Sequence, residues 1–411
     1  MKQFNIWLNV VCFLLLMGLG ACEKEMETVK EPLTDNNKIE EVSDTSNYKV
    51  SLTEVQAFGI NYNGQLDFVD YDNLQRTQTT WVRGFVDFFQ FYNDPSKLDT
   101  DVRIQNYLTL KDNGYKTILN IKWDFKGKGL SMPAVGSQEM TDYKNFLTQV
   151  LNKVWNKTDI IVVGNEPFIE TPIGERDQRL VDFYKEIAKK VKNYRTNQTK
   201  NDTPIFLGAI NNLYQNSLRT QAVVDLLAFV KEKNWISGID LHIHHSAIED
   251  ITGSMDYVNT RIRDDQKILV TEFSLMKHWK LKLQENIPSN FAQEYGRNTN
   301  WKNYQYIDYA LKNPVSRPEW VAFLQNSYWF ENRKFYLSNA YDLMTGYNKF
   351  YIATYGIRQS YPYGQDFTAN TDPWVLNALY VNRSVVLNPS TGQEQFNYAF
   401  IDDFRAIQNM N

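Results

Sequence analysis

The sequence predicts an α/β fold in which eight parallel strands close into a (β/α)8 TIM barrel. Short runs of apolar and β-branched residues recur along residues 55–329, and amphipathic helical patterns fall between several of them. Strands that alternate with helices pair in parallel through helical crossovers. An open doubly wound sheet is disfavoured, because residues 58–64 do not match the glycine-rich phosphate-binding turn typical of that architecture.

Eight runs have the length and composition of buried strands. They are residues 55–61, 81–87, 117–123, 159–165, 204–210, 236–242, 267–272 and 321–329. Apolar side chains recur at the three- and four-residue spacing of a one-sided helix in residues 142–157, 180–194 and 223–230. In a barrel of this kind the active site lies at the C-terminal ends of the strands.

The first 21 residues have the layout of an export signal. Lys2 supplies a positive start, and residues 10–19 form an apolar stretch too short to span a membrane. The tetrad Leu19-Gly20-Ala21-Cys22 resembles the lipobox of bacterial lipoproteins. That resemblance implies cleavage before Cys22 and attachment of lipid to its sulfur; an ordinary secretory signal or an uncleaved anchor is the alternative.

Residues 22–49 are polar and acidic, and we expect them to form a flexible tether. An acidic stretch directly after a lipidated Cys resembles the surface-export signal of lipoproteins in Bacteroidetes-type bacteria. It implies an outer membrane lipoprotein on the cell surface that touches the membrane only through its lipid, with a periplasm-facing orientation as the alternative. The other cysteine, Cys12, lies in the predicted signal, so the mature chain can form no internal disulfide.

Residues 50–411 are predicted to form one catalytic domain, which we expect to be monomeric. The net charge is −4 and there is no basic stripe, so nucleic acid is not an expected partner. Aromatic residues make up 14% of the chain, with 10 Trp and 25 Tyr. Such an excess suits a groove that stacks on sugar rings, although a large core would use the same residues.

Two glutamates end apolar strands. Glu166 follows the run 159–165 in the sequence Asn165-Glu166-Pro167, and Glu272 ends the run 267–272 after Thr271. A carboxyl group at the rim of a core has a pKa that burial and neighbouring charges can shift. Paired carboxylates are the minimal apparatus for cleaving a glycosidic bond. A helix-entry carboxylate before Pro167 and a strand-end ion pair at Glu272 are the structural alternatives.

Asn-Glu-Pro at the tip of strand four and Thr-Glu at the tip of strand seven resemble the clan A glycoside hydrolases, which are retaining (β/α)8 enzymes. The resemblance covers about residues 55–329, and the family within the clan is unresolved. It implies that Glu166 is the acid/base, that Glu272 is the nucleophile of a covalent glycosyl-enzyme, and that Asn165 binds the sugar 2-hydroxyl. The two carboxyl groups should then lie about 5–5.5 Å apart, with Glu166 protonated and Glu272 ionised.

Charged and polar residues on other strands are candidate supports. Arg83 is a charge within an apolar strand, and the resemblance implies that it keeps the nucleophile ionised; a surface Arg is the alternative. Strand alternation places Asp240, His242 and His244 on one face. The resemblance gives His242 a hydrogen-bonding role and puts His244 where a Tyr would touch the nucleophile. A core His and a metal site are alternatives, but we expect no metal ion or other cofactor.

Two tryptophans end predicted strands. Trp329 closes the predicted eighth strand, where clan members carry a Trp that forms the floor of the subsite for the cleaved sugar. Trp123, at the tip of the third strand, is a second substrate-binding candidate. Tyr62, Trp279 and Tyr328 are further possible groove residues, and a packed core aromatic is the alternative for each.

These features predict a retaining glycoside hydrolase that is endo-acting on a β-linked polysaccharide. Surface anchoring favours endo action, because long chains must be cut before import. Two other functions stay open. A non-catalytic glycan-binding lipoprotein on the same scaffold would have one glutamate missing or misplaced, and a metal-dependent hydrolase using the strand-six histidines would lose activity with a chelator.

Overall fold

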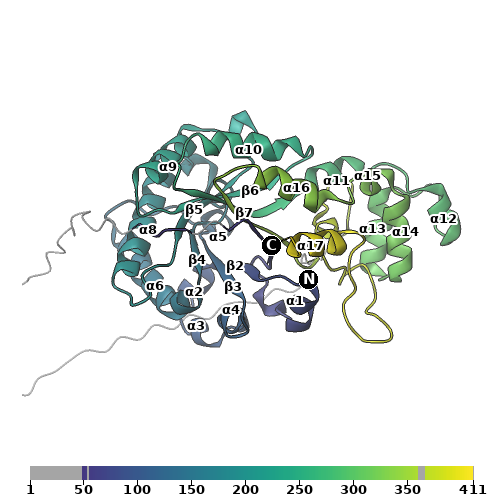
Figure 1. The fold of residues 1–411 in the computed structure, drawn as a ribbon, viewed down its shortest axis with the longest axis horizontal. Coiled ribbons are helices and arrows are strands. Elements are labelled where there is room, and N and C mark those ends of the chain that lie inside the picture. Colours follow the sequence, from purple (N-terminus) through teal and green to yellow (C-terminus); the bar gives the residue numbers. More distant parts are fainter. Residues whose placement is uncertain (1–48, 53–54, 360–365, 411) are drawn as a thin grey trace, which may run out of the picture. The chain divides into compact units, whose positions relative to one another are not determined.

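Eight parallel strands close into a barrel in which each strand pairs with the next and β8 pairs with β1 (Figure 1). The strands are β1 (Ala57–Asn61), β2 (Trp81–Asp87), β3 (Lys116–Lys122), β4 (Ile160–Val163), β5 (Ile205–Asn211), β6 (Gly238–His244), β7 (Lys267–Ser274) and β8 (Phe350–Gly356). This topology confirms the predicted (β/α)8 barrel. The computed structural model describes residues 49–52, 55–359 and 366–410, so the predicted signal, Cys22 and nearly all of the predicted tether lie outside the described residues.

Helices follow the strands around the barrel. In the first half they are α1 (Tyr71–Thr77), α2 (Phe88–Tyr92), α3 (Lys97–Thr100), α4 (Val102–Asp112), α5 (Phe125–Lys128), α6 (Gln138–Val154), α7 (Pro167–Glu170), α8 (Gln178–Thr196), α9 (Gln221–Glu232) and α10 (Glu249–Asn259). In the second half they are α11 (Met276–Lys282), α12 (Ser289–Glu294), α13 (Asn303–Lys312), α14 (Arg317–Asn326), α15 (Tyr328–Glu331), α16 (Tyr336–Thr345) and α17 (Phe400–Gln408). Among the described residues, no helix combines the length and the apolar character needed to cross a bilayer.

The helical patterns of the sequence correspond to α6, α8 and α9. The side chain of Ser137 accepts a hydrogen bond from the backbone N–H of Met140, and this cap begins α6. Asp177 begins α8 in the same way, by accepting from the N–H of Arg179. The apolar faces of α6, α8 and α9 are buried, as the periodicity predicts.

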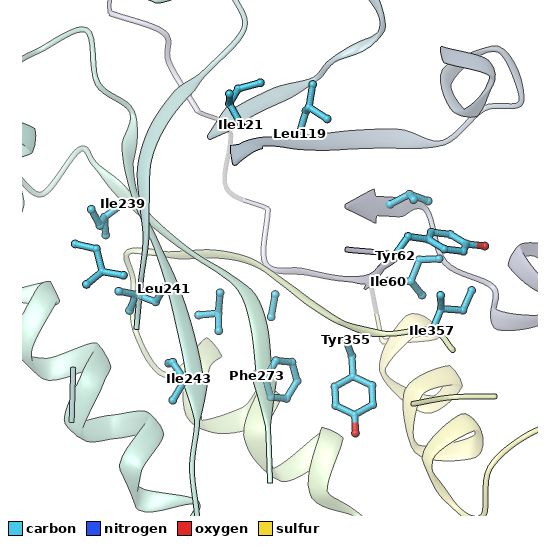
Figure 2. Packing of buried hydrophobic residues seen from close by; sticks show 14 of the residues in the cluster. Ile60, Tyr62, Leu119, Ile121, Ile239, Leu241, Ile243, Phe273, Tyr355 and Ile357 are labelled. Atoms are coloured by element: carbon cyan, nitrogen blue, oxygen red, sulfur yellow. The ribbon is translucent and has the colours of Figure 1, made fainter. Parts of the chain in front are cut away.

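Strand side chains alternate between the helices and the barrel interior. Figure 2 shows outward-facing residues such as Leu241 and Ile243 of β6 and Phe273 of β7, which belong to the main hydrophobic core. A second apolar cluster fills the interior and consists of Ala57, Trp81, Ile118, Ile160, Val162, Phe206, Leu269, Tyr351 and Ile352. Nearer the C-terminal ends of the strands, the interior side chains become polar, and they include the buried Arg83 and Asp240. The apolar layer therefore supports a polar layer at the barrel mouth.

The prediction that residues 321–329 form the eighth strand is wrong. These residues lie in α14 and α15, whereas β8 is Phe350–Gly356. Ser316 caps α14 by accepting from the N–H of Glu319, with a Pro in the first turn, and such a start favours a helix. The buried residues Trp320, Phe323 and Leu324 then follow at helical spacing. Helices α11 to α16 thus occupy the connection between β7 and β8, and Figure 1 shows α11 to α15 beside the barrel.

Gly238 at the start of β6 provides a test of the barrel packing. A Cβ atom there would lie 1.8 Å from the carbonyl oxygen of Lys267 and 2.7 Å from the Phe206 ring. We expect Gly238→Ala to lower the free energy of unfolding by about 1–3 kcal/mol, the usual cost of overpacking, as measured by urea denaturation. Gly174→Ala, where a Cβ meets open space, is the control. Equal stability of the two variants would contradict the close approach of β6 and β7.

Candidate active site

The C-terminal ends of the strands surround a cavity of about 350 Å³ that contains both predicted glutamates. Its lining consists of Asn61, Tyr62, Asn63, Gln65, Phe85, Lys122, Asn165, Glu166, Glu170, His244, Glu272, Gly356, Ile357, Arg358, Trp374 and Asn377. The volume lies within the range of small-ligand pockets. The pocket brings together segments from both ends of the described chain.

A sharp turn after β4 places Glu166 in this pocket. Gly164 has φ of 112°, and a Cβ atom there would lie 2.0 Å from the carbonyl oxygen of Gly208. Glu166 itself has φ of 47°, a left-handed conformation that is costly for a residue with a side chain. The helix α7 begins directly after it with Pro167. Strain of this kind is concentrated at functional sites, because the surrounding structure must hold it.

A buried arginine organises the opposite side of the mouth. Arg83 is 0% exposed, and its Nη1 donates to Oε1 of Glu272 at 2.7 Å. The same guanidinium donates from Nη2 to Oδ1 of Asn165 at 2.5 Å and from Nε to Oδ1 of Asn120 at 2.9 Å. Oδ1 of Asn61 accepts from Nη1 at 3.0 Å. The buried cation is therefore both paired and hydrogen-bonded, which a charge in a barrel interior requires.

A second chain of hydrogen bonds fixes the orientation of His242. Asp240 accepts from the backbone N–H of Thr271 at 3.0 Å and from its hydroxyl at 2.6 Å. Because the Thr271 hydroxyl donates its proton to Asp240, its oxygen can accept from Nε2 of His242, 3.1 Å away. Nδ1 of His242 then faces Oε1 of Glu166 at 3.1 Å. One proton is shared between His242 and Glu166.

The ionisation of this pair differs from the prediction. Burial raises the pKa of Glu166, but the hydrogen bond and charge of His242, with the charge of His244, lower it overall. Burial lowers the pKa of His242, but the charge of Glu272 and the contact with Glu166 raise it overall. These shifts oppose the predicted protonated Glu166 in the ligand-free protein and favour the shared proton on His242. The sequence could not reveal this, because it does not show that the imidazole touches the carboxylate.

His244 lies on the other side of the glutamates. Its Nε2 is 3.8 Å from Oε2 of Glu272, and its Nδ1 is 2.9 Å from Oγ of Ser274. Burial is the main cause that lowers the pKa of His244. Glu166, His242, His244 and Glu272 each offer one possible metal-ligand atom, and these atoms lie within 4.8 Å of one another.

Comparison with solved structures finds the same barrel in other proteins. A family 39 glycoside hydrolase from Bacteroides cellulosilyticus is 10% identical, with a TM-score of 0.50, over 87% of this chain and 64% of that chain. A beta-glucosidase from Exiguobacterium marinum is 8% identical, with a TM-score of 0.50, over 86% and 97% of the two chains. An enzyme named AHE from Alicyclobacillus herbarius is 8% identical, with a TM-score of 0.51, over 88% and 97%.

The chain shares their fold. It spans less than two thirds of the family 39 protein. No family model matches the sequence, and comparison with curated proteins finds no match.

The predicted tryptophan platforms are wrong. Trp329 belongs to α15, is 7% exposed and packs against Trp279, with ring centroids 5.6 Å apart. Trp123 is 0% exposed and stacks on Phe88 at 3.9 Å. Neither of them occurs among the described residues that line the pocket, because both are covered by core aromatics.

The three weaker aromatic candidates separate clearly. Tyr62 lines the pocket. Trp279 is buried in the core, whereas Tyr328 is 79% exposed. Neither Trp279 nor Tyr328 is among the described pocket-lining residues.

Two pocket aromatics were not among the predicted candidates, namely Phe85 of β2 and Trp374 in the segment after β8. Trp374 is the one nearest the histidines. Its ring lies edge-on to His244, with centroids 4.8 Å apart. The indole of Trp279 donates to Oδ1 of Asn377 at 3.0 Å, and Lys280 pairs with Asp372 at 2.5 Å, so α11 holds this segment in place. The short apolar and aromatic run 350–356, which ends in glycine, was the signal that could have located β8 and the residues that follow it.

A second titratable cluster lies at the edge of the pocket. Lys122 at the end of β3 pairs with Glu170 of α7, with Nζ and Oε1 2.9 Å apart. Burial and a hydrogen bond to Asp124 raise the pKa of Glu170 to about 8, although the charge of Lys122 opposes the shift. This shift favours the protonated form of Glu170 at neutral pH in the folded protein.

This raised pKa predicts a pH-dependent stability. An unfolded Glu titrates near pH ~4.3, so between that pH and about 8 the folded chain binds the extra proton. The stability that this extra proton contributes is therefore complete below pH ~4.3. It is lost as the pH rises through about 8, the pKa of Glu170 in the folded protein. We expect Glu170→Gln to reduce the fall in unfolding free energy between pH 5 and 9, by up to about 4 kcal/mol.

Chemical denaturation at pH 5 and 9 measures this effect. Glu249→Gln, at an exposed position on α10, is the matched control and should keep the native pH dependence. If the unfolding free energy of Glu170→Gln depends on pH as that of the native protein does, Glu170 does not have a raised pKa.

Proposed function

We propose that the protein is a retaining glycoside hydrolase in which Glu272 is the nucleophile and Glu166 the acid/base. One observation carries the proposal, namely that the His242 ring bridges the two carboxylates. Its Nδ1 is 3.1 Å from Glu166 and its Nε2 is 3.5 Å from Glu272. One oxygen of each glutamate lies within 4.8 Å of the other. Such a short separation supports double displacement, since inverting enzymes keep their carboxyl groups about 6.5–9.5 Å apart.

The reaction proceeds in two balanced steps. In the first, Glu272 attacks the anomeric carbon, the glycosidic C–O bond breaks, and Glu166 passes a proton to the leaving oxygen. In the second, Glu166 removes a proton from water, whose oxygen attacks the anomeric carbon and releases the Glu272 carboxylate. The sugar keeps its configuration because the anomeric centre is inverted twice.

His242 supplies the proton for the first step. In the ligand-free protein the shared proton rests on Nδ1, next to Oε1 of Glu166. Thr271 and Asp240 hold the proton on Nε2, so only the Nδ1 proton can move toward Glu166. A glycosidic oxygen that binds beside Glu166 accepts this proton through the carboxyl group as its bond to carbon breaks.

Neighbouring side chains complete the site. Arg83 keeps Glu272 ionised through the 2.7 Å ion pair. Because Oδ1 of Asn165 accepts from Arg83, its amide N–H groups are left for the sugar 2-hydroxyl. His244 contacts the nucleophile. Trp374 takes the role of the sugar platform that the sequence had assigned to Trp329.

The wider proposal concerns substrate and location. We infer a β-linked polysaccharide as substrate, cut internally by a monomeric enzyme that needs no cofactor. The enzyme would be anchored through lipid on Cys22 at the outer membrane and exposed on the cell surface, as the N-terminal sequence suggests. A non-catalytic glycan-binding protein is disfavoured, because both glutamates line one pocket with a proton donor between them.

Substitution of the nucleophile tests the mechanism. We expect Glu272→Ala to lower kcat at least about 1,000-fold on any β-glycan of a broad panel that the native protein cleaves. Sodium azide should restore activity, because the anion fits where the carboxylate was removed, and the product should be a glycosyl azide of inverted configuration. Sugar-release assays and NMR of the product measure both effects. Full activity of Glu272→Ala would sink the mechanism.

Two controls accompany this experiment. Glu285→Ala removes an exposed carboxylate that pairs with Lys282, and it should leave activity unchanged. EDTA should also leave the native activity unchanged. Loss of activity with EDTA and its return with Zn²⁺ would instead favour a metal-dependent hydrolase that uses Glu166, His242, His244 and Glu272.

The shared proton predicts the pH profile. The raised pKa of His242 keeps the proton available below that pKa, so the rate falls as pH rises through it. We expect the basic limb of kcat/KM to lie above about pH 6.5, the ordinary value for His. His242→Gln should lower kcat/KM by about 100-fold, whereas His278→Gln, on α11, should not. A basic limb below about pH 5 would contradict proton storage on His242.

A further inference from the structure

A second cavity of about 350 Å³ adjoins the active-site pocket. The two cavities share three lining residues, Asn63, Gln65 and Phe85. The other residues of the second cavity are Gly64, Leu66, Val86, Asp87, Gln90, Phe91, Arg103 and Ile104. It therefore opens from the side of the pocket formed by the chain after β1 and by the end of β2.

The lining of this second cavity suits a sugar ring, which has apolar C–H faces and a polar rim. Leu66, Phe91 and Ile104 provide an apolar floor of buried side chains. Asp87 and Gln90 are half-buried and polar. The Gln90 amide donates to Asp101 over a long 3.4 Å contact, so a ligand hydroxyl can replace that partner. A largely apolar wall with a few polar groups is typical of a ligand site.

The Phe85 ring lines both cavities, and it is held in place. A Cβ atom on Gly64 would lie 2.6 Å from this ring, so only glycine lets the loop pack against it. The Lys122 ammonium lies 5.3 Å from the ring centroid. The ring is thus a fixed wall that both cavities use.

We propose that the second cavity is a subsite for further glycosyl units of the same chain whose cleaved unit occupies the active-site pocket. This inference rests on the proposed function and deepens it, because it makes an oligosaccharide or polysaccharide the substrate class. A simple monoglycoside would leave the second cavity empty. Gln90 and Asp87 would then contact the further sugar units, so they determine the preference of the enzyme for longer substrates.

Chain-length dependence tests the proposal. The probes are β-1,3-, β-1,4- and β-1,6-linked gluco-, manno- and xylo-oligosaccharides of two to six units, in the linkage that the native protein cleaves. We expect kcat/KM to rise with length until the second cavity is filled. The measured quantity is kcat/KM for a five-unit oligosaccharide divided by kcat/KM for a two-unit one. Gln90→Ala should lower this ratio by about three- to tenfold, because it removes one hydrogen bond to the longer substrate. Gln90→Trp, which fills the cavity, should lower it further.

Gln138→Ala, at an exposed position on α6 outside both cavities, is the matched control and should keep the native ratio. Cleavage that is independent of chain length, or a native ratio in both Gln90 variants, would overturn the subsite while leaving the proposed function intact. Failure of the native protein to cleave any oligosaccharide or polysaccharide would instead count against the proposed function.

Discussion

The buried guanidinium of Arg83 is the constraint on which the barrel mouth depends. A cation with no exposed surface is tolerated only if its donors all find acceptors. Those acceptors come from different strands and loops, namely Asn61, Asn63, Asn120, Asn165 and Glu272. Satisfying one arginine therefore fixes the ends of β1, β3, β4 and β7 relative to one another, and with them Glu272, the proposed nucleophile.

Asn120 joins this network to the one that governs the proton. Its Oδ1 accepts from Arg83, while its Nδ2 donates to Oδ2 of Asp240 at 3.0 Å. Asp240 orients Thr271, and Thr271 sets which nitrogen of His242 faces Glu166. The ion pair of Glu272 with Arg83 and the hydrogen bond between His242 and Glu166 are thus linked through a single buried amide. The proposed double displacement needs this link, since a proton must be available at Glu166 while Glu272 stays ionised.

Sequence patterns predicted the parts of this site that local rules control. Glu166 and Glu272 end apolar strands, and Arg83 interrupts one, so strand periodicity alone exposed them. The run 321–329 failed because an apolar segment of nine residues fits a buried strand or a buried helix equally well, and the cap at Ser316 decided for helix. Trp374 and the direction of the His242 proton depend on contacts between distant segments, which no local pattern encodes.

Chemistry and recognition are consequently supported by different parts of the chain. The proposed reacting groups, Glu166 and Glu272, lie at the C-terminal ends of barrel strands, close to the hydrogen bonds of Arg83. A small shift there would break several hydrogen bonds at once. Trp374 instead depends on the helices between β7 and β8, through the bond from Trp279 to Asn377 and the Lys280–Asp372 pair. Changes in these outer segments can therefore reshape the proposed sugar-binding surface around Trp374 without disturbing the carboxylate pair.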